Sequence, residues 1–157
     1  MDLNVRVEGA RGPFERVDDH ADYRVENPAC VPLTAVTGAT VVPEQHLPLN
    51  FTRIAHGDYG TDVVLDRFLD EYYFGQEVCH WALVGVVADF HLGEADFSPS
   101  IAQAGMLAGR EISRYFSVGS HARTSQRRID TDGPTAYNDP RATAQIRVQT
   151  GAVSVDR

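Results

Sequence analysis

Five acidic residues within fourteen positions form the group of side chains best placed to do chemistry. Three of them are separated by even steps, so on an extended strand they would share one face. Such a face could hold Ca²⁺, could bind a basic protein partner, or could be the solvated side of an edge hairpin. No DxDxDG calcium loop is present, so we assign no metal ligands and predict a partner-binding surface. The group comprises Asp58, Asp62, Asp66, Asp70 and Glu71, of which Asp62, Asp66 and Asp70 are the evenly spaced members.

An aromatic run follows these acids directly. Tyr72, Tyr73 and Phe74 precede Gly75, and glycine readily adopts the positive φ that a tight turn needs. Aromatic side chains anchor many protein interfaces, so the turn could be a recognition loop. The same rings could instead pack within the turn or in the core. We include Tyr72 and Tyr73 in the predicted partner-binding surface.

The histidines and serines show no pattern typical of an enzyme. The six histidines form no HxH or HExxH motif, and no serine lies in a GxSxG sequence. His80 could act as a base or a ligand, but a hydrogen-bonded histidine on the outer face of a sheet is the simpler interpretation. With 22 acidic residues, some pair of carboxylates will have glycosidase spacing by chance. We therefore predict no enzyme, no catalytic residues and no cofactor.

The chain has two cysteines, Cys30 and Cys79, and neither lies in a CxxC or metal-ligand pattern. They could be two buried thiols of a cytosolic protein, or one disulfide formed in an oxidising compartment. Cys30 stands between Pro28 and Pro32 in a segment of low secondary-structure propensity, which would gain most from a covalent tie to a strand. We favour the disulfide, which would stabilise the fold by about 3–4 kcal/mol in the chain-entropy treatment.

Length and charge limit the class of protein. The 157 residues suffice for one domain with a hydrophobic core, and the formal net charge is −8. An acidic chain is repelled by phosphate backbones, so we expect no nucleic-acid partner. No segment is apolar enough to span a membrane as a helix, and the first residues lack the basic and apolar regions of a signal peptide. If the protein is exported, we expect its signal to be missing from this sequence, and a lipid at the missing N-terminus could tether it to a membrane.

The elements that must position these residues are predicted from side-chain alternation. The region from Asn50 to His91 organises the chain, because it holds the only tryptophan, one of the cysteines and most of the clustered aromatics. Its last strand is apolar on both faces, which indicates a central strand, and its valines argue against a helix over Trp81–Phe90. The strands predicted here are Leu47–Ile54, Thr61–Leu69 and Val78–His91.

The rest of the chain predicts further short strands. They are Asp2–Glu8, Tyr23–Glu26, Leu33–Val42, Arg110–Val118 and Ala144–Thr150, and the segment Phe14–Asp22 is polar and acidic. Ser98 or Ser100 could cap a short helix through Ala104–Leu107, while loops are expected at Leu92–Ser98 and in a polar arm near residues 119–142. Many short strands separated by Pro and Gly favour an all-β fold. We predict one antiparallel β-sandwich domain over residues 1–157, immunoglobulin-like or related.

The block LDRFLDEYYFGQEVCHW, from Leu65 to Trp81, resembles a segment of small exported bacterial proteins, several of them lipoproteins. In these a D-E-x-Y-x-G-x-x-V-C-H-W pattern precedes a long central strand. Some resemble immunity proteins that protect a bacterium against toxins of contact-dependent systems, of the type VI and type IV secretion kind. The resemblance implies that Cys79 is structural and is bonded to Cys30. It also implies a non-enzymatic protein that covers the active site of a toxin.

These expectations lead to one functional hypothesis. We predict a periplasmic or outer-membrane-tethered immunity protein that binds and neutralises a cognate toxin effector. The alternative is a small-ligand or carbohydrate-binding β module of the cell envelope, and an enzyme ranks last. The predicted contacts are the acidic group and the aromatic turn, with aromatics supplying affinity and acids setting the encounter rate.

Overall fold

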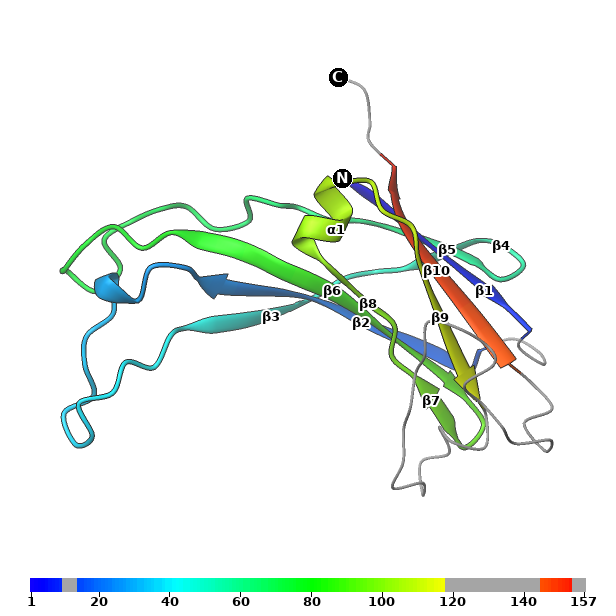
Figure 1. The fold of residues 1–157 in the computed structure, drawn as a ribbon, viewed down its shortest axis with the longest axis horizontal. Helices are drawn as coiled ribbons and strands as arrows, with labels where there is room; N and C mark the ends of the chain where they lie inside the picture. Colours follow the sequence, from blue (N-terminus) through cyan, green and yellow to red (C-terminus); the bar gives the residue numbers. More distant parts are fainter. Residues whose placement is uncertain (10–13, 118–144, 154–157) are drawn as a thin grey trace.

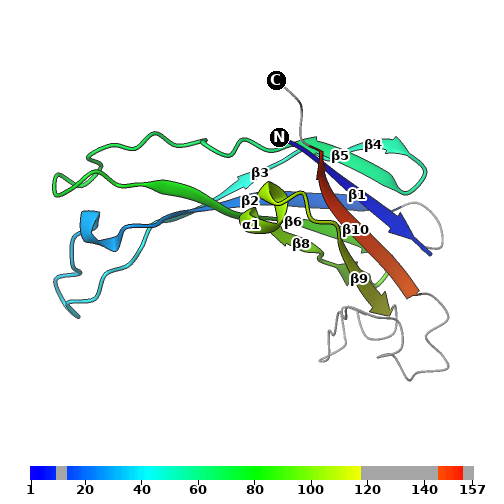
Figure 2. The ribbon, with the colours of Figure 1, turned by 45° about the horizontal axis from the view of Figure 1, so that its top comes forward.

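The computed structural model describes residues 1–9, 14–117 and 145–153, which form two antiparallel sheets facing each other (Figures 1 and 2). Sheet 1 has the order β4-β5-β1-β10-β9, and sheet 2 has the order β3-β2-β6-β7, with β8 also paired to β6. Sheet 1 comprises β1 Asp2–Glu8, β4 Thr52–Ala55, β5 Asp58–Asp62, β9 Ile112–Ser117 and β10 Gln145–Val153. Sheet 2 comprises β2 Arg16–Val25, β3 Glu44–Pro48, β6 Trp81–Leu92, β7 Ala95–Phe97 and β8 Ser100–Ala102. The predicted all-β, antiparallel sandwich is confirmed.

Alternating side chains fill the space between the two sheets. In β1, Leu3, Val5 and Val7 are buried, whereas the residues between them are exposed. On the other side β6 buries Leu83 and Phe90 in the same two core clusters. β6 pairs with β2 along one edge and with β7 and β8 along the other, which confirms the predicted central strand. Each side chain of this size contributes about 1.5–3 kcal/mol when fully buried.

The single strand predicted over Leu47–Ile54 is wrong, because β3 and β4 lie in different sheets. β3 ends at Pro48, which has no N–H to continue a ladder, and the chain then crosses from sheet 2 to sheet 1. Asp19 of β2 holds this crossing: Leu49 N donates to its backbone oxygen at 3.1 Å, and Phe51 N donates to its carboxylate at 2.7 Å. Burial raises the pKa of the Asp19 carboxyl. The alternating residues Leu47, Leu49 and Phe51 do pack against the core, but local alternation does not reveal that the chain changes sheet between them.

The strand predicted over Thr61–Leu69 ends early, because β5 stops at Asp62. Asp62 is opposite Asp2, the first residue of β1, so β5 ends level with the start of β1. The chain leaves the sheet at the buried Val63, whose N–H donates to the backbone oxygen of Met1 at 2.8 Å. Residues 63–80 then cross to β6 of sheet 2 without forming a strand.

Two other predictions near the N-terminus are corrected. β2 starts at Arg16 rather than at Tyr23, because Val17 packs against the core and Ala21 is buried in it, while Asp18 and His20 lie on the opposite face. The polar composition of this segment concealed its alternation. The strand predicted over Leu33–Val42 is reduced to one isolated bridge, between Leu33 and Thr40.

The helix prediction is confirmed, but its cap and the preceding loop are not. α1 spans Gln103–Leu107 and follows Ala102, which makes no side-chain cap, because Ser100 belongs to β8. The loop predicted over Leu92–Ser98 contains β7, which folds back on β6 through a turn at Gly93 with a φ of 58°. Glycine adopts this left-handed conformation without steric cost.

A disulfide joins Cys30 to Cys79, with a Cα–Cα distance of 5.3 Å. Cys30 ends η1, the short 3-10 helix Pro28–Cys30 that follows β2, and Cys79 lies just before β6. β2 and β6 are neighbours in sheet 2, so the bond closes one end of that sheet, whereas the immunoglobulin disulfide connects two sheets. Both cysteines are fully buried, in a small cluster with Val25 and Val31.

The predicted polar arm near residues 119–142 lies outside the described residues. β9 and β10 on either side of it pair antiparallel, with Ile146 opposite Phe116, which confirms the strands predicted at both places. Within the part of the chain that the structure describes, no helix has the length and apolar character needed to cross a membrane.

Replacing both cysteines by alanine should weaken the fold without changing its topology. The bond closes a loop with a sequence separation of 49, so we expect the free energy of unfolding to fall by about 2–4 kcal/mol and Tm by roughly 5–15 °C. Denaturant unfolding measures the first and calorimetry the second. Mass measurement under non-reducing conditions should show no free thiol in the parent chain; two free thiols would contradict the assignment.

Candidate functional site

Two segments outside the regular strands meet at the disulfide end of the molecule. Residues 31–43 follow η1, and residues 63–80 precede β6; together we call them the tip. In Figures 1 and 2 residues 31–43 lie at the left end, and residues 63–80 run from β5 of sheet 1 to that same end, where β6 and β2 extend away from sheet 1. The disulfide joins the base of one segment to the base of the other. The tip is therefore a covalently linked projection from sheet 2.

Exposed apolar side chains are concentrated in the tip. Among the described residues eleven large apolar side chains are exposed, and eight belong to the tip, three in residues 31–43 and five in residues 63–80. Val36 is 95% exposed and Tyr72 is 67% exposed. Leaving apolar surface in water is unfavourable by about 25 cal/mol per Å², so such concentrations mark interaction sites. The eight residues are Leu33, Val36, Val41, Val64, Leu69, Tyr72, Tyr73 and Phe74.

An aromatic stack holds residues 63–80 against sheet 2. The ring of Phe68 stacks on Trp81 at a centroid distance of 4.6 Å and meets Tyr23 edge-on at 5.3 Å. The ring of Tyr73 also contacts Trp81, edge-on, at a centroid distance of 6.3 Å. The hydroxyl of Tyr23 also donates to the backbone oxygen of Val64. Aromatic pairs of this kind add about 0.5–1.5 kcal/mol each beyond their buried area.

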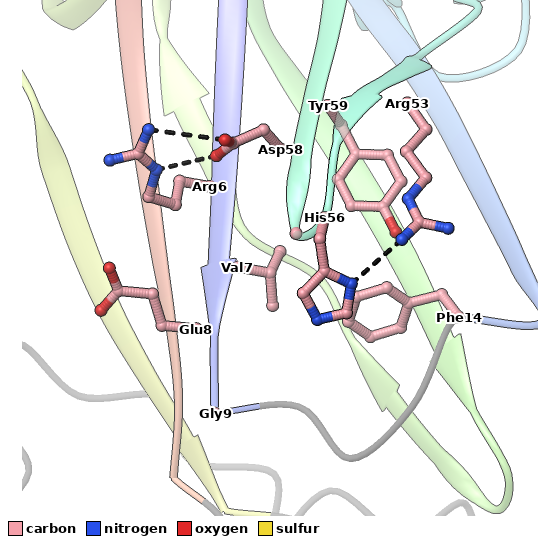
Figure 3. A pocket seen from close by; sticks show the side chains of 10 residues that line it. Arg6, Val7, Glu8, Gly9, Phe14, Arg53, His56, Asp58 and Tyr59 are labelled. Atoms are coloured by element: carbon pink, nitrogen blue, oxygen red, sulfur yellow. Dashed lines mark hydrogen bonds and ion pairs between the residues drawn. The ribbon is translucent and has the colours of Figure 1, made fainter.

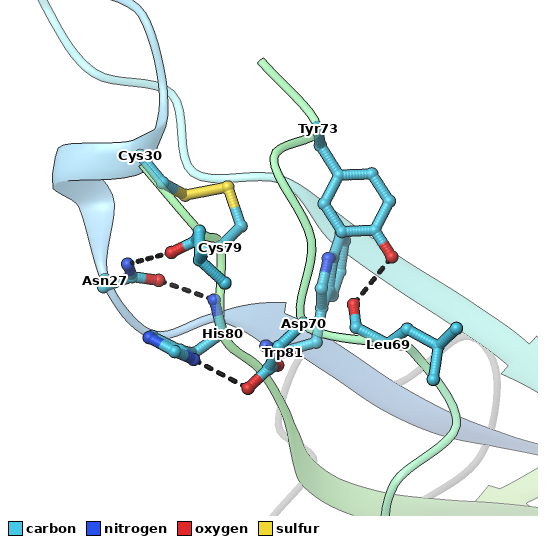
Figure 4. Close-up of polar contacts among 9 residues, drawn as sticks. Asn27, Cys30, Leu69, Asp70, Tyr73, Cys79, His80 and Trp81 are labelled. Carbon is cyan, nitrogen blue, oxygen red and sulfur yellow. Dashed lines mark hydrogen bonds and ion pairs between the residues drawn. A yellow bond between two sulfur atoms is a disulfide. The ribbon is translucent and has the colours of Figure 1, made fainter. Parts of the chain in front are cut away.

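Hydrogen bonds fix the base of the tip (Figure 4). The Asn27 side chain donates to the backbone oxygen of Val78 at 2.8 Å and accepts from the N–H of His80 at 2.7 Å. The Asp70 carboxylate contacts Nδ1 of His80 at 2.7 Å and accepts from the N–H of Trp81 at 3.3 Å. These bonds replace the ladder that a strand would have made, so the segment is held although it has no sheet partner.

The aromatic turn, residues 72–78, is a loop whose two ends are paired with each other. Glu71 and Cys79 form an isolated bridge, in which the Cys79 N–H donates to the Glu71 oxygen at 2.9 Å. Between them Gly75 has a φ of 73°, as the sequence predicted for a tight turn. The Tyr73 hydroxyl donates to the backbone oxygen of Leu69 at 2.8 Å. This bond stabilises the turn, although the Tyr73 ring is itself 44% exposed. Tyr72 and Phe74 remain exposed on a fixed loop.

Charge in the tip is unevenly divided. Residues 31–43 contain no charged side chain, whereas residues 63–80 carry Asp66, Asp70, Glu71 and Glu77 against Arg67 alone. All four acids are exposed. The hydrogen bond from His80 holds the pKa of the Asp70 carboxyl below its usual value of 3.8, and the Trp81 N–H adds to this effect. Exposed apolar side chains thus lie on both segments of the tip, and the four acids, which we call the acidic margin, lie on residues 63–80 alone.

The structure divides the predicted acidic group. Asp66, Asp70 and Glu71 lie in residues 63–80 together with Tyr72 and Tyr73, as the partner-binding prediction requires of them. Asp58 and Asp62 are in β5 of sheet 1 instead, so the expectation that all the evenly spaced acids share one strand face is wrong.

The two separated acids have other partners. Asp58 forms an ion pair with Arg6 at 2.7 Å, which Figure 3 shows beside β1. Asp62 shares a hydrogen bond with Asp2, which raises the pKa of the Asp2 carboxyl. Neither contact belongs to the tip.

One of several hollows in the described surface, of about 460 Å³, lies near the β4–β5 turn (Figure 3). Its lining includes Phe14, Arg53, His56 and Tyr59. Tyr59 is only 8% exposed and packs edge-on against Phe14 and Phe90, so these rings serve the core. Sugar binding on aromatic faces therefore finds little support in this hollow.

The histidine contacts also differ from those of a nucleophile-activating site. His80 lies beside Asp70 on the exposed surface, in keeping with the simpler of its two interpretations. His91 lies between Asp18 and Asp96, at 3.1 and 2.7 Å. His91 also lies 3.5 Å from the Arg16 guanidinium, and His56 lies 3.0 Å from the Arg53 guanidinium.

The exposed residues of segment 31–43 were missed from the sequence. Leu33, Val36 and Val41 were assigned to a strand, where alternate side chains would be covered. The available indication was the complete absence of charge between Val31 and Pro43, an unusual feature for a surface loop of this length.

Comparisons with protein-family models, with curated proteins and with solved structures found no match.

The Asp70–His80 contact gives a measurable pH dependence. Because the folded-state pKa of Asp70 is lowered, its contribution to stability is present above the unfolded value near 3.8 and is lost as the pH falls through the lower folded value. Carboxyl ¹³C NMR should show Asp70 still ionised when an ordinary aspartate is half protonated. His80→Ala should raise the pKa of Asp70 toward 3.8. An unchanged Asp70 titration in that variant would show that His80 is not the cause.

Proposed function

We propose that this chain is a non-enzymatic immunity protein of the bacterial cell envelope, which binds a toxin effector through the tip and neutralises it by covering its functional surface. The observation that carries this proposal is the clustering of exposed apolar side chains on two segments that are fixed by the disulfide, the aromatic stack and the Asn27 and Asp70 hydrogen bonds. The toxin as partner is suggested by the resemblance of Leu65–Trp81 to immunity proteins.

The rigidity of the tip supports binding to another protein. A loop that is already ordered loses little conformational entropy on association, so more of the apolar burial is retained as affinity. Tyr72 and Phe74 are exposed on the braced turn, and Val36 projects from the uncharged segment. Aromatic anchors of this kind supply most of the binding energy in many interfaces.

Charge indicates the kind of partner surface. The tip carries four acids and one arginine, and the whole chain has a formal net charge of −8. Partners with an apolar patch bordered by Lys and Arg would be attracted, since opposite potentials accelerate encounter. A toxin that acts on nucleic acid or on anionic lipid has such a basic surface, which an acidic binder could occupy.

The disulfide supports the proposed compartment. Disulfides persist in oxidising compartments such as the periplasm and are rare in the reducing cytosol. The Cys30–Cys79 bond ties together the two segments proposed to bind, so loss of the bond would affect both. We propose a periplasmic location. We further propose that an N-terminal lipid tethers the protein to the outer membrane.

The test begins with the product of the adjacent gene. Purified chain and purified gene product should form a 1:1 complex, and exporting this chain should protect cells from that product. Binding without protection would retain the protein-binding role but reject the toxin. Protection without binding would reject the tip mechanism. If neither binding nor protection is observed, the whole proposal is rejected.

Apolar contacts in the tip can be tested with a matched pair of variants. Leu69→Ser removes an exposed apolar side chain from the tip, whereas Leu107→Ser removes one from α1; their exposures are 70% and 57%. Burying a leucine contributes about 1.5–3 kcal/mol, so Leu69→Ser should raise Kd by about tenfold or more. Leu107→Ser should leave Kd unchanged. Equal effects of the two substitutions in calorimetric titration would show that the tip is not the contact.

The acidic margin can be tested by kinetics. Asp66→Asn removes one charge from the tip, and Asp58→Asn removes the same charge from β5. Asp66→Asn should slow association a few-fold and reduce its dependence on salt, because steering acts through charges near the contact. Stopped-flow measurements at low and high ionic strength give both quantities. A larger effect from Asp58→Asn would place the partner on sheet 1 instead.

A further inference from the structure

Three potential metal ligands come together on the outer face of sheet 2, away from the residues proposed to bind a protein. His20 and Asp22 are two positions apart on β2, so both side chains point to the same side of the strand. The residues that alternate with them, Ala21 and Tyr23, are buried in the core, so this side is the solvent face. His46 of β3 is directly opposite Asp22 in the antiparallel register.

The distances bring their ligand atoms to one point. Oδ1 of Asp22 is 2.6 Å from Nδ1 of His46 and 3.4 Å from Nε2 of His20. All three ligand atoms lie within 4.8 Å of one another. The two imidazole rings stand nearly perpendicular, with centroids 5.8 Å apart, so they do not stack and each presents a nitrogen to the carboxylate.

We propose that His20, Asp22 and His46 form a binding site for a divalent transition metal ion, Zn²⁺ above all. Two imidazole nitrogens and one carboxylate oxygen are a ligand set that zinc prefers, whereas Mg²⁺ and Ca²⁺ prefer oxygen alone. Both cysteines are in the disulfide, so no thiolate of this chain competes for the ion.

The observed spacing requires only small side-chain adjustment. With metal–ligand bonds of about 2.0–2.1 Å, tetrahedral ligands lie about 3.3 Å apart. The His20–Asp22 separation of 3.4 Å matches this value, and the His46–Asp22 separation of 2.6 Å must open slightly. His46 is the most exposed of the three, with 65% of its side chain accessible, so its ring is free to turn.

The strand pairing makes this site different from the other histidine contacts. His80 has a similar contact with Asp70, at 2.7 Å, but no second histidine completes a described set of three. His91 meets two carboxylates with its two different ring nitrogens, which point in opposite directions and cannot bind one ion together. Only at His20, Asp22 and His46, within the described residues, do three such groups converge.

Three protein ligands leave at least one coordination position of the ion open. His20 and Asp22 are partly accessible and His46 is exposed, so water or a ligand atom from a bound molecule can reach that position. The site does not depend on the tip or on the proposed toxin. If partner binding required zinc, the metal site and the tip would be functionally connected. The proposed metal site does not depend on such a connection.

The experiment measures Zn²⁺ binding directly, on the full chain freed of metal by chelation. Titration with ZnCl₂ in competition with a chromophoric chelator should show one tight site per chain. A ¹H–¹⁵N spectrum should show the imidazole nitrogens of His20 and His46 shifting with the same stoichiometry. Excess Mg²⁺ or Ca²⁺ should not displace the zinc.

Variants locate the site. Asp22→Asn and His46→Ala should each weaken zinc binding by at least about tenfold, since even loss of an outer-shell partner costs 10–100-fold. His80→Ala is the matched control, because it removes an exposed histidine that also contacts an aspartate, and it should leave zinc affinity unchanged. Circular dichroism checks that each variant is folded. The proposal is overturned if the chain binds no zinc, if Mg²⁺ competes equally, or if Asp22→Asn and His46→Ala bind zinc like the parent chain.

Discussion

The Cys30–Cys79 bond determines what one end of this molecule can be. It joins the chain leaving β2 to the chain entering β6, at the end of a sheet that extends beyond its partner sheet. Without a facing sheet, the segments there share only the small buried cluster of Val25, Cys30, Val31 and Cys79. The covalent link, together with the Phe68–Trp81 stack and the Asn27 hydrogen bonds, holds them in place. The tip can therefore expose apolar side chains and still keep a fixed shape.

Sheet 2 separates its tasks by face and by position. Its inner face supplies the core through residues such as Ala21, Leu83 and Phe90. Its outer face brings His20, Asp22 and His46 together through the β2–β3 register. Its far end carries the tip. Because strand alternation directs neighbouring side chains to opposite faces, a ten-residue strand such as β2 can serve the core and a surface site at once.

Elements whose two faces differ clearly in polarity were predicted well. β1, β6 and β9 follow apolar alternation, and their positions agree with the structure to within a few residues. The errors have physical causes. β5 ends level with the first residue of β1, and β3 and β4 belong to different sheets although their apolar spacing is continuous. Pairing partners are set by residues distant in sequence, which local alternation does not reveal.

By itself the sequence determined the all-β class, the central strand, the acidic character and the identity of the only possible disulfide, because these follow from composition and local alternation. It also located the aromatic turn, since Gly75 marks the reversal. Only the tertiary structure moved Asp58 and Asp62 away from Asp66 and Asp70, exposed residues 31–43, and brought His46 to Asp22. Those results depend on which strands pair and where the chain changes sheet, and the contacts that decide this are long-range.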